Sequence, residues 1–246
     1  MEAVKPSYQI MTPLDTSAQR LNILMNLEDA GRVCYKSEHK NPNGDLDITI
    51  PFLEGIIRKG HESVLEHEKL TIKFVVDRGV SHELVRHRIC SFSQESTRYC
   101  NYGKKGMQFI LPPWADEYWL GELTESKLSD AKEGEMGGNM TDKGIADMKW
   151  AFAVVAAGEY YLRLLELGQS PQQARAVLPN SLKTEIVVTA NIRQWREVFR
   201  QRCHGTAHPQ MREIMRPLYC ELRNRLPVLF SDLFNDSWVD DEWNQL

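Results

Sequence analysis

The sequence predicts an α+β protein, with a few β-strands and several long helices. Three observations lead to this fold class. Apolar residues recur at helical spacing in several segments, and two shorter segments alternate apolar and polar residues, as strands with one buried face do. The strands do not alternate regularly with the helices, which disfavours a doubly wound parallel sheet. The 246 residues suffice for a hydrophobic core, and we expect a single domain over residues 1–246.

The first part of the chain predicts two helices. Residues 15–33 place apolar side chains on one helical face. Residues 51–59 predict a second helix, with Pro51 in its first turn and Gly60 after its end. Proline is tolerated where a helix begins, and glycine favours the C-terminal cap.

A strand and a short helix follow. Residues 70–77 alternate apolar with polar side chains, which is typical of a strand with one buried face, and Gly79 interrupts the pattern. Residues 81–88 predict a short helix for which Ser81 is the N-cap.

The second half of the chain combines one unusual segment with regular elements. Residues 112–148 are rich in acidic residues and glycine, so we expect an exposed, partly mobile excursion and not a separate domain. A long helix is predicted from about 146 to 167. A strand is predicted over 182–191, and helices are predicted over 192–202 and 209–226.

Charge and composition disfavour several protein classes. The formal net charge of -4 and the pI of about 6.0 argue against a general nucleic-acid coat protein, which is normally basic. No apolar run approaches the ~20 residues of a membrane helix, and residues 1–10 lack the form of a signal peptide. The five widely spaced cysteines suit a reducing cytosol. We therefore expect a cytoplasmic protein without nucleic-acid or membrane partners, and with an acidic tail from about residue 231.

The segment from His82 to His87, HELVRH, resembles the zinc-hydrolase motif H-E-x-x-H. In that motif the two histidines are four residues apart and share one face of a helix. Here they are five residues apart, so the second ring turns away from the first, and no third ligand is evident. We expect no metal site, and a metal hydrolase stays as an alternative.

The segment from Arg86 to Tyr99, RHRICSFSQESTRY, concentrates anion-binding groups. Arg86, His87 and Arg88 are consecutive, so their side chains at a helix end diverge by about 200° and suit two ligands lying side by side. Hydroxyl and amide side chains follow, and Arg98 adds a planar fork suited to phosphate or carboxylate. A solvated basic face is the alternative. The mixture of arginines with apolar residues favours a groove for a phosphate-rich small ligand.

Residues 60–67, GHESVLEH, form a polar link into the first strand. A capped turn with solvated side chains is one interpretation. The other is a loop that presents His61 and Ser63 to a ligand.

The segment after residue 190 is rich in arginine. Asn191 lies at a strand end, where ligands often bind. Arg193, Arg196 and Arg200 follow at spacings of three and four, so they share a helical face, whereas Arg202 lies about 180° round from Arg193. A surface ion pair with a nearby glutamate is the alternative role for any one of them.

These residues resemble the flavin-dependent thymidylate synthases. The family signature is Arg-His-Arg, seven residues and then serine, which here reads Arg86-His87-Arg88, ICSFSQE and Ser96. His61 within GHES stands 25 residues before Arg86. The segment ARAVLP at Arg175, with Asn191 and Arg202, keeps the family's order and spacing, and the resemblance covers about Cys34 to Ile214.

The resemblance implies an enzyme that methylates dUMP to dTMP. Methylenetetrahydrofolate would give the carbon, NADPH the electrons, and FAD would carry the hydride. The family's fold is a small, mostly antiparallel sheet wrapped by helices. The resemblance also implies self-association into a homotetramer with shared active sites.

The resemblance assigns roles by position. Residues matched to FAD contacts are Ser63, Arg86, His87, Arg88, Gln94, Asn191 and Arg193. Residues matched to dUMP contacts are Glu83, Arg86, Gln94, Glu95, Ser96, Arg98, Arg175 and Arg202. As catalytic residues, Arg202 matches an arginine that polarises uracil, and His61 a histidine linked to folate and NADPH use. A cation at the pyrimidine edge stabilises negative charge as C5 becomes nucleophilic.

Three positions depart from relatives. Gln94 stands where some members have glutamate, and Glu83 where some have glutamine; both accept hydrogen bonds. Glu197 stands where an asparagine or histidine would contact flavin, and a carboxylate suits flavin phosphates poorly, so we assign it no role. A nucleotide- or RNA-binding module without chemistry is an alternative that the net charge disfavours.

Overall fold

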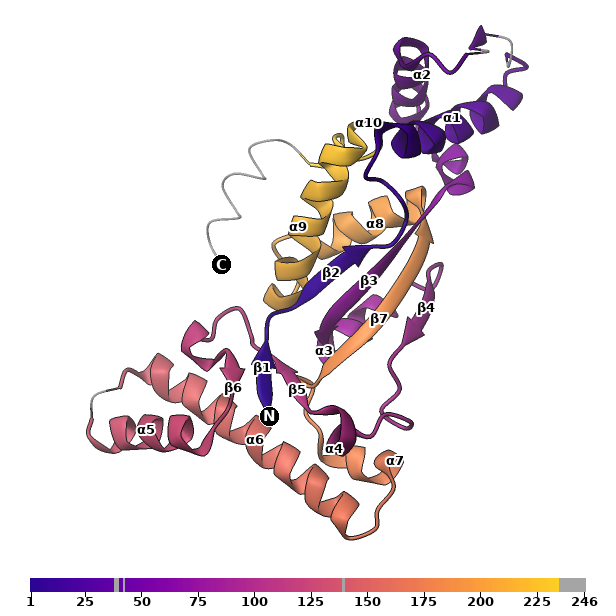
Figure 1. Ribbon diagram of the computed structural model, residues 1–246. Helices are drawn as coiled ribbons and strands as arrows, with labels where there is room; N and C mark the ends of the chain where they lie inside the picture. Colours follow the sequence, from indigo (N-terminus) through magenta and orange to yellow (C-terminus); the bar gives the residue numbers. More distant parts are fainter. Residues whose placement is uncertain (38–39, 42, 139, 235–246) are drawn as a thin grey trace. The chain divides into compact units, whose positions relative to one another are not determined.

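The computed structural model describes residues 1–246 except 38–39, 42, 139 and 235–246 (Figure 1). The chain divides into two compact units. Unit 1 consists of Met1–Ser7, Phe74–Arg86 and Ser93–Ile186. Unit 2 consists of Tyr8–Lys73, His87–Phe92 and Val187–Leu246. That the chain behaves as a single domain stays a prediction.

The described residues form two small sheets. In the first, β1 (Glu2–Val4) lies between β5 (Gln108–Ile110), to which it is parallel, and β6 (Gly121–Glu122), to which it is antiparallel. The second has the order β2-β3-β7-β4 and consists of β2 (Ser7–Ile10), β3 (Lys69–Asp77), β7 (Lys183–Asn191) and β4 (Ser91–Gln94). The sheets are mostly antiparallel, so the predicted α+β fold class is confirmed.

Most helices of unit 1 pack against one hydrophobic core. Its helices are α3 (Arg78–Leu84), α4 (Tyr102–Lys105), η3 (Glu117–Trp119), α5 (Glu125–Met136), α6 (Asp142–Glu166), α7 (Pro171–Ala174) and η4 (Arg175–Val177). The long helix α6 buries Met148, Ala151 and Val154 in this core, together with Phe109 of β5. Removing such apolar area from water stabilises the fold by about 25 cal/mol per Å².

Most described residues of the acidic segment 112–148 are exposed or half-buried, but a few of its apolar side chains are buried in this core. Trp119 and Leu123 are buried, and α5 buries Leu128 on one side while its charged residues face solvent. The buried apolar residues are few among many polar and acidic ones, so the composition of the segment does not reveal its buried face.

Unit 2 contains α1 (Ser17–Val33), α2 (Leu46–Arg58), η2 (Glu62–His67), α8 (Ile192–Arg202), α9 (Pro209–Arg225) and α10 (Pro227–Phe230). Its core includes a group of aromatic rings. The rings of Trp195 and Phe199 stack with centroids 5.7 Å apart, and Tyr219 and Phe230 meet Phe199 edge-on. The indole Nε1 of Trp195 donates to the Leu70 carbonyl at 3.0 Å, which fixes α8 against β3 within this unit.

Two helices begin earlier than predicted. Helix α2 begins at Leu46, because the Asp45 carboxylate caps it by accepting from the Asp47 amide at 2.9 Å, and Pro51 lies inside the helix. Helix α3 begins at Arg78, because Asp77 caps it. Ser81 therefore lies within α3, where its hydroxyl donates to the Arg78 carbonyl at 2.9 Å.

No helix among the residues that the structure describes is both long and apolar enough to cross a membrane. The acidic tail predicted from about 231 lies outside the described residues from 235 onward.

Candidate functional site

The predicted site residues are distributed over both units. Unit 2 carries the following: His61, Ser63, His87, Arg88, Asn191, Arg193 and Arg202. Unit 1 carries the others: Glu83, Arg86, Gln94, Glu95, Ser96, Arg98 and Arg175. Most positions matched to flavin thus belong to unit 2, and most positions matched to the nucleotide belong to unit 1.

A cavity of about 520 Å³ opens in unit 2 at the beginning of α8. Asn191 is the N-cap of this helix, and its side-chain carbonyl accepts from the Gln194 amide at 2.8 Å. The Asn191 amide group keeps its two N–H donors for a ligand. The lining residues are Glu62, Glu66, Ile89, Asn191, Arg193, Gln194, Glu197 and Arg200. Two predicted residues, Asn191 and Arg193, therefore share one cavity.

The arginines of this cavity are paired with carboxylates. Arg193 Nη1 lies 2.6 Å from a Glu66 oxygen, and Arg200 lies 3.3 Å from Glu62 and 3.8 Å from Glu197. The Arg193–Glu66 pair is about half exposed, and an exposed pair of this kind contributes only ~0–1 kcal/mol. A phosphate can therefore replace the carboxylate at little cost.

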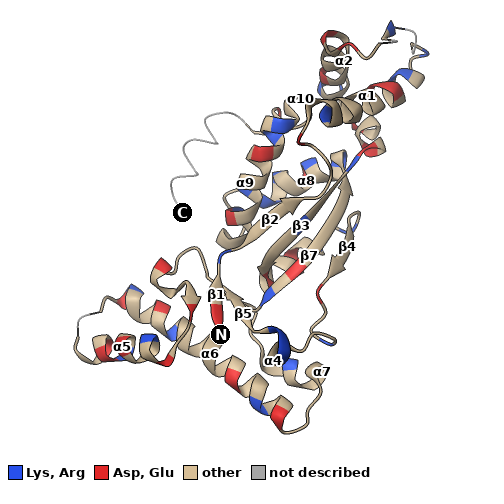
Figure 2. Ribbon diagram, viewed as in Figure 1, with Lys and Arg blue, Asp and Glu red and all other residues tan. Residues whose placement is uncertain are grey.

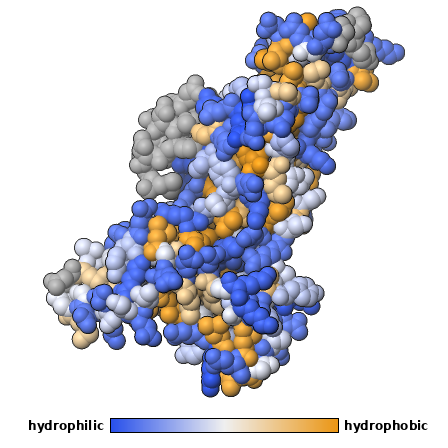
Figure 3. Space-filling view, in the orientation of Figure 1, coloured by the Kyte–Doolittle hydropathy of each residue, from blue (hydrophilic) through white to orange (hydrophobic). Residues whose placement is uncertain are grey.

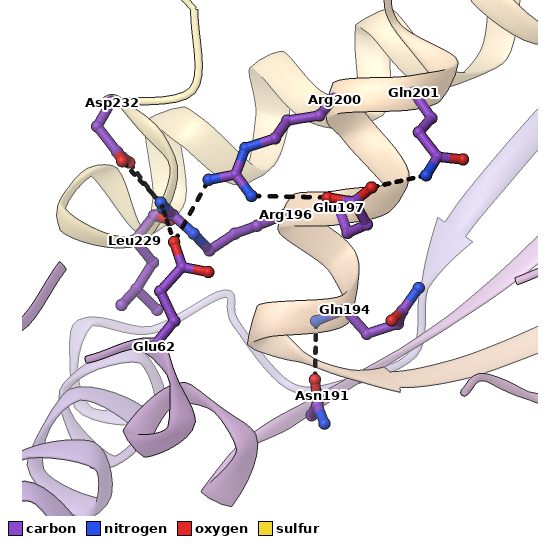
Figure 4. A network of polar contacts seen from close by, with 9 residues as sticks. All are labelled: Glu62, Asn191, Gln194, Arg196, Glu197, Arg200, Gln201, Leu229 and Asp232. Atoms are coloured by element: carbon purple, nitrogen blue, oxygen red, sulfur yellow. Dashed lines mark hydrogen bonds and ion pairs between the residues drawn. The ribbon is translucent and has the colours of Figure 1, made fainter. Parts of the chain in front are cut away.

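Arg196 has a different environment from its two neighbours on α8 (Figure 4). Its side chain is fully buried, and its guanidinium donates to the Leu229 carbonyl, to both oxygens of Asp232 and to Glu62. Arg193 and Arg200 line the cavity, whereas Arg196 connects α8 with η2 and with the residues after α10. Its role is structural.

His87 and Arg202 are in direct contact within unit 2. Arg202 Nε donates to His87 Nε2 at 2.9 Å, and His87 is only 7% exposed. Since Nε2 accepts this bond, neutral His87 carries its proton on Nδ1. Burial, and then the charge of Arg202, lower the pKa of His87 to about 4, although Glu197 acts in the opposite direction. His87 is therefore neutral at pH 7 and holds one edge of the Arg202 guanidinium.

This pair predicts a pH dependence of stability. The imidazole takes up a proton near pH 6.5 in the unfolded chain but only near pH 4 in the folded one. The stability that neutral His87 contributes to the folded protein is therefore fully present above pH 6.5 and is lost as the pH falls to 4. We expect the free energy of unfolding to fall by about 3 kcal/mol more in the wild type than in His87→Gln over this window, because glutamine accepts the bond without titrating. Urea denaturation between pH 4 and 7 measures this; parallel curves for the two proteins contradict it.

Other predicted residues of unit 2 are exposed. His61 Nδ1 forms a hydrogen bond of 2.8 Å with the Tyr35 hydroxyl. Ser63 is exposed on η2, and Arg88 is exposed next to His87. Arg88 forms no hydrogen bond or ion pair with any side chain that the structure describes, and the same holds for Arg86 of unit 1. Both guanidinium groups are therefore available to a ligand.

In unit 1, Gln94 is held in one orientation. Its Nε2 donates to the Ser81 hydroxyl at 2.9 Å and to the Thr184 hydroxyl at 3.3 Å. Arg78 also donates to Thr184 Oγ1, at 3.3 Å. With both amide protons used, the Gln94 carbonyl oxygen is the group that can accept from a ligand.

The segment after Gln94 presents further polar groups. Arg175 Nη1 donates to the buried Thr97 hydroxyl at 2.9 Å, which brings η4 next to this segment. Arg98 lies over the exposed ring of Tyr99, 5.6 Å from its centroid, and the Ser96 hydroxyl accepts from the Arg98 amide at 3.3 Å. Arg175 of η4 thus lies next to the short stretch that carries Ser96 and Arg98. Glu83 is half-buried on α3.

Glu95 points to a separate cavity of unit 1, of about 350 Å³. Lys183 lies there between Glu185 at 2.8 Å and Glu95 at 3.9 Å. Tyr102 lines the same cavity, and burial, followed by the charge of Glu95, raises its pKa. This cavity is close to electrically balanced, and Glu95 is the one predicted residue in its lining.

The structure separates the two histidines of HELVRH. His82 is exposed on α3 in unit 1, whereas His87 is buried in unit 2 against Arg202. Within the described part of the chain, no group of three or more His, Cys, Asp or Glu residues could hold a metal ion.

Several cavity residues carry no sequence prediction. Glu62 and Glu66 lie close to Arg193 and Arg200 only through the fold, since about 130 residues separate them. For Arg200 a signal exists, because it stands seven residues after Arg193 and therefore two turns further on the same helical face.

Comparison with known proteins gives consistent matches over most of the chain. A family model described as Thymidylate synthase complementing protein (Thy1) matches residues 22–228. The flavin-dependent thymidylate synthase of Corynebacterium aurimucosum is 35% identical over 216 residues, which cover 87% of this chain and 81% of that protein. A probable flavin-dependent thymidylate synthase of Mycobacterium phage D29 is 35% identical over 211 residues, which cover 84% of this chain and 81% of that protein.

Two solved structures have a similar fold. One is the UMP/dUMP methylase PolB from Streptomyces cacaoi, bound with 5-Br dUMP, with a TM-score of 0.66 and 24% identity over 94% of this chain and 96% of that one. The other is Thymidylate Synthase X (ThyX) from Helicobacter pylori with FAD and dUMP, with a TM-score of 0.66 and 23% identity over 96% of this chain and 99% of that one.

Proposed function

Because this chain belongs to the Thymidylate synthase complementing protein (Thy1) family of flavin-dependent thymidylate synthases, we propose that it is the enzyme that methylates dUMP to dTMP. Methylenetetrahydrofolate gives the carbon and NADPH the electrons. The observation that carries this proposal is the cavity at the start of α8, which joins the N–H donors of Asn191 to the guanidinium of Arg193. Further expectations are self-association into a homotetramer and a cytoplasmic location.

The residues around this cavity fit FAD. Two arginines line it, each paired with a carboxylate that a pyrophosphate would have to replace. Arg88, next to the lining residue Ile89, has no side-chain partner among the described residues and adds a further guanidinium. FAD, when bound, supplies the hydride-carrying chemistry of the reaction. Glu197 also lines the cavity, where Gln201 donates to it at 2.6 Å and Arg200 lies close, so its charge is partly neutralised.

Unit 1 supplies the groups for the nucleotide. Ser96, Arg98 and Arg175 provide a hydroxyl and two guanidinium groups suited to a phosphate. Ser81 and Thr184 orient the Gln94 side chain. Its carbonyl oxygen is therefore suited to accept a hydrogen bond from the N3–H of uracil.

Arg202 is the catalytic residue in this proposal. His87 holds its Nε, which orients the planar guanidinium, and in this proposal the guanidinium binds an oxygen of the uracil ring. A cation at this oxygen stabilises negative charge as C5 becomes nucleophilic.

The Arg193–Glu66 pair predicts how a carboxylate affects flavin affinity. Glu66 competes with the pyrophosphate for Arg193, so Glu66→Gln is expected to tighten FAD binding about two- to fivefold, equivalent to ~0.5–1 kcal/mol. Titration of the apoprotein with FAD, followed by flavin fluorescence, measures the change. Glu54→Gln, a substitution on α2 away from this cavity, is the matched control. Equal affinities for Glu66→Gln and Glu54→Gln contradict the competition.

Three measurements test the proposed function together. The purified protein is expected to be yellow or to become so with added FAD, and NADPH is expected to bleach the flavin. Tritium is expected to leave 5-tritiated dUMP only when methylenetetrahydrofolate is present. Parallel assays with UMP decide whether the deoxyribose is required. A colourless protein that cannot be loaded with FAD overturns the proposal.

A further inference from the structure

A second cavity of unit 2, away from α8, has an unusual charge distribution. It has a volume of about 550 Å³ and lies between the end of α1 and one side of α2. Four cations line it: Arg32, Lys40, Arg58 and Lys59. None of the described lining residues is acidic, in a chain whose formal net charge is -4. We refer to it as the α1–α2 cavity.

Three of these cations have no ion-pair partner among the residues that the structure describes. Arg32 is buried and paired with Glu28, whose other oxygen accepts from Asn41 at 2.7 Å and from Thr49. Lys40, Arg58 and Lys59 form no ion pair with any side chain that the structure describes. By contrast, the arginines around the cavity of α8 are all paired. Three positive charges in one lining, with no counter-ion in the described part of the chain, make this cavity an attractive site for an anion.

Figure 2 shows lysine and arginine residues among acidic ones on α1 and α2. Arg58 and Lys59 lie at the C-terminal end of α2, where the negative end of the helix dipole stabilises cations and partly offsets their positive charge. Since α2 is capped at both ends by described residues, these two side chains extend from a well-formed helix end.

The lining of the cavity also contains two aromatic rings. Arg32 lies over the Phe52 ring, 4.4 Å from its centroid, and Tyr35 meets Phe52 edge-on at 6.4 Å. The Tyr35 ring is half exposed and its hydroxyl is held by His61. Figure 3 shows hydrophobic side chains between hydrophilic ones over α1 and α2. A ligand can therefore place an apolar or planar part here and its charges at the helix end.

Two lining residues, Phe52 and Ile56, pack closely against α1. A Cβ atom on Gly31 of α1 would lie only 2.8 Å from Ile56 and 2.9 Å from Phe52 of α2. The two helices therefore approach at the glycine backbone, which fixes Phe52 relative to α1 without a ligand.

We propose that the α1–α2 cavity binds the anionic tail of a co-substrate. The ligand chemistry is several phosphate or carboxylate groups attached to a planar ring system. Two sources fit it: the phosphates of the nicotinamide nucleotide, or the glutamate chain of the folate. This inference rests on the proposed function for the identity of the ligand, whereas the anion site itself depends only on the charges described above.

The double variant Arg58→Ala with Lys59→Ala tests the proposal. We expect the KM of one co-substrate to rise about tenfold, which corresponds to ~1.4 kcal/mol, while kcat and the KM of dUMP change less than twofold. If the phosphates bind here, the variant loses the preference of the wild type for NADPH over NADH. If the glutamate chain binds here, it loses the preference for tetraglutamyl over monoglutamyl folate. The matched control removes two exposed lysines of unit 1, with Lys104→Ala and Lys132→Ala.

A binding experiment separates this inference from the proposed function. NADP⁺ and tetraglutamyl folate are titrated calorimetrically into wild type and both double variants at two salt concentrations. Weaker, less salt-sensitive binding of either ligand to the Arg58 and Lys59 variant supports the site even if no dTMP forms. An active enzyme with unchanged KM values, unchanged preferences and unchanged binding in that variant overturns the inference and leaves the proposed function standing.

Discussion

Replacing Arg202 with alanine is expected to lower kcat for dTMP formation about 100- to 1000-fold, the usual cost of removing one electrostatic donor from a transition state. The flavin content is expected to stay at the wild-type level, because the cavity at the start of α8 is lined by other residues of unit 2. Arg202→Lys keeps the charge but loses the planar fork and the Nε–H that His87 accepts, so we expect partial activity.

The measurement is single-turnover formation of dTMP by flavin-loaded enzyme, with absorbance to determine the flavin content. Gln201→Ala, the preceding residue on α8, is the matched control, since its side chain contacts Glu197 and not Arg202. Wild-type turnover in flavin-loaded Arg202→Ala would remove the assigned role.

Replacing Arg196 with methionine is expected to lower the free energy of unfolding by about 2–4 kcal/mol. The substitution keeps the apolar volume but leaves the Leu229 carbonyl, Asp232 and Glu62 without their buried donor. The value lies below the ~3–5 kcal/mol of a fully buried pair because Asp232 is about half exposed and can be solvated.

Urea denaturation at pH 7 measures this loss. Arg200→Met is the matched control, because Arg200 is one turn further along α8 and contacts the same Glu62 from an exposed position. We expect it to cost less than about 0.5 kcal/mol. Similar losses for the two variants contradict the distinction between a buried and an exposed arginine.

For Arg196 and Arg200, the sequence predicts the helical face that they share but not which of them is buried. Helical spacing places Arg193, Arg196 and Arg200 on one side of a helix, and α8 extends over the predicted residues 192–202. Which arginine is buried depends on Glu62 and Asp232, which are 134 and 36 residues away. No local pattern contains that information.

The same reasoning applies to the elements that differ from prediction. The burial of Trp119 and Leu123 depends on packing with α6 and β1, so the acidic composition of their segment does not reveal that these two side chains are buried. The early start of α2 had a local signal in Asp45, a good N-cap, which Pro51 obscured because proline also favours a helix start. The predicted roles of the site residues stay predictions, although the structure places Asn191 and Arg193 on one cavity and His87 against Arg202.

Helix α8 begins at the Asn191 cap and ends with Arg202. At 1.5 Å per residue, these two residues lie roughly 16 Å apart along one rigid element. The length of the helix therefore sets the distance between Asn191, which would bind the flavin, and Arg202, which would polarise the uracil. Inserting or deleting one residue would change this length by about 1.5 Å and turn Arg202 by about 100° away from His87. Substitutions on the outer face of α8 are thus tolerable, whereas a change in its length is not.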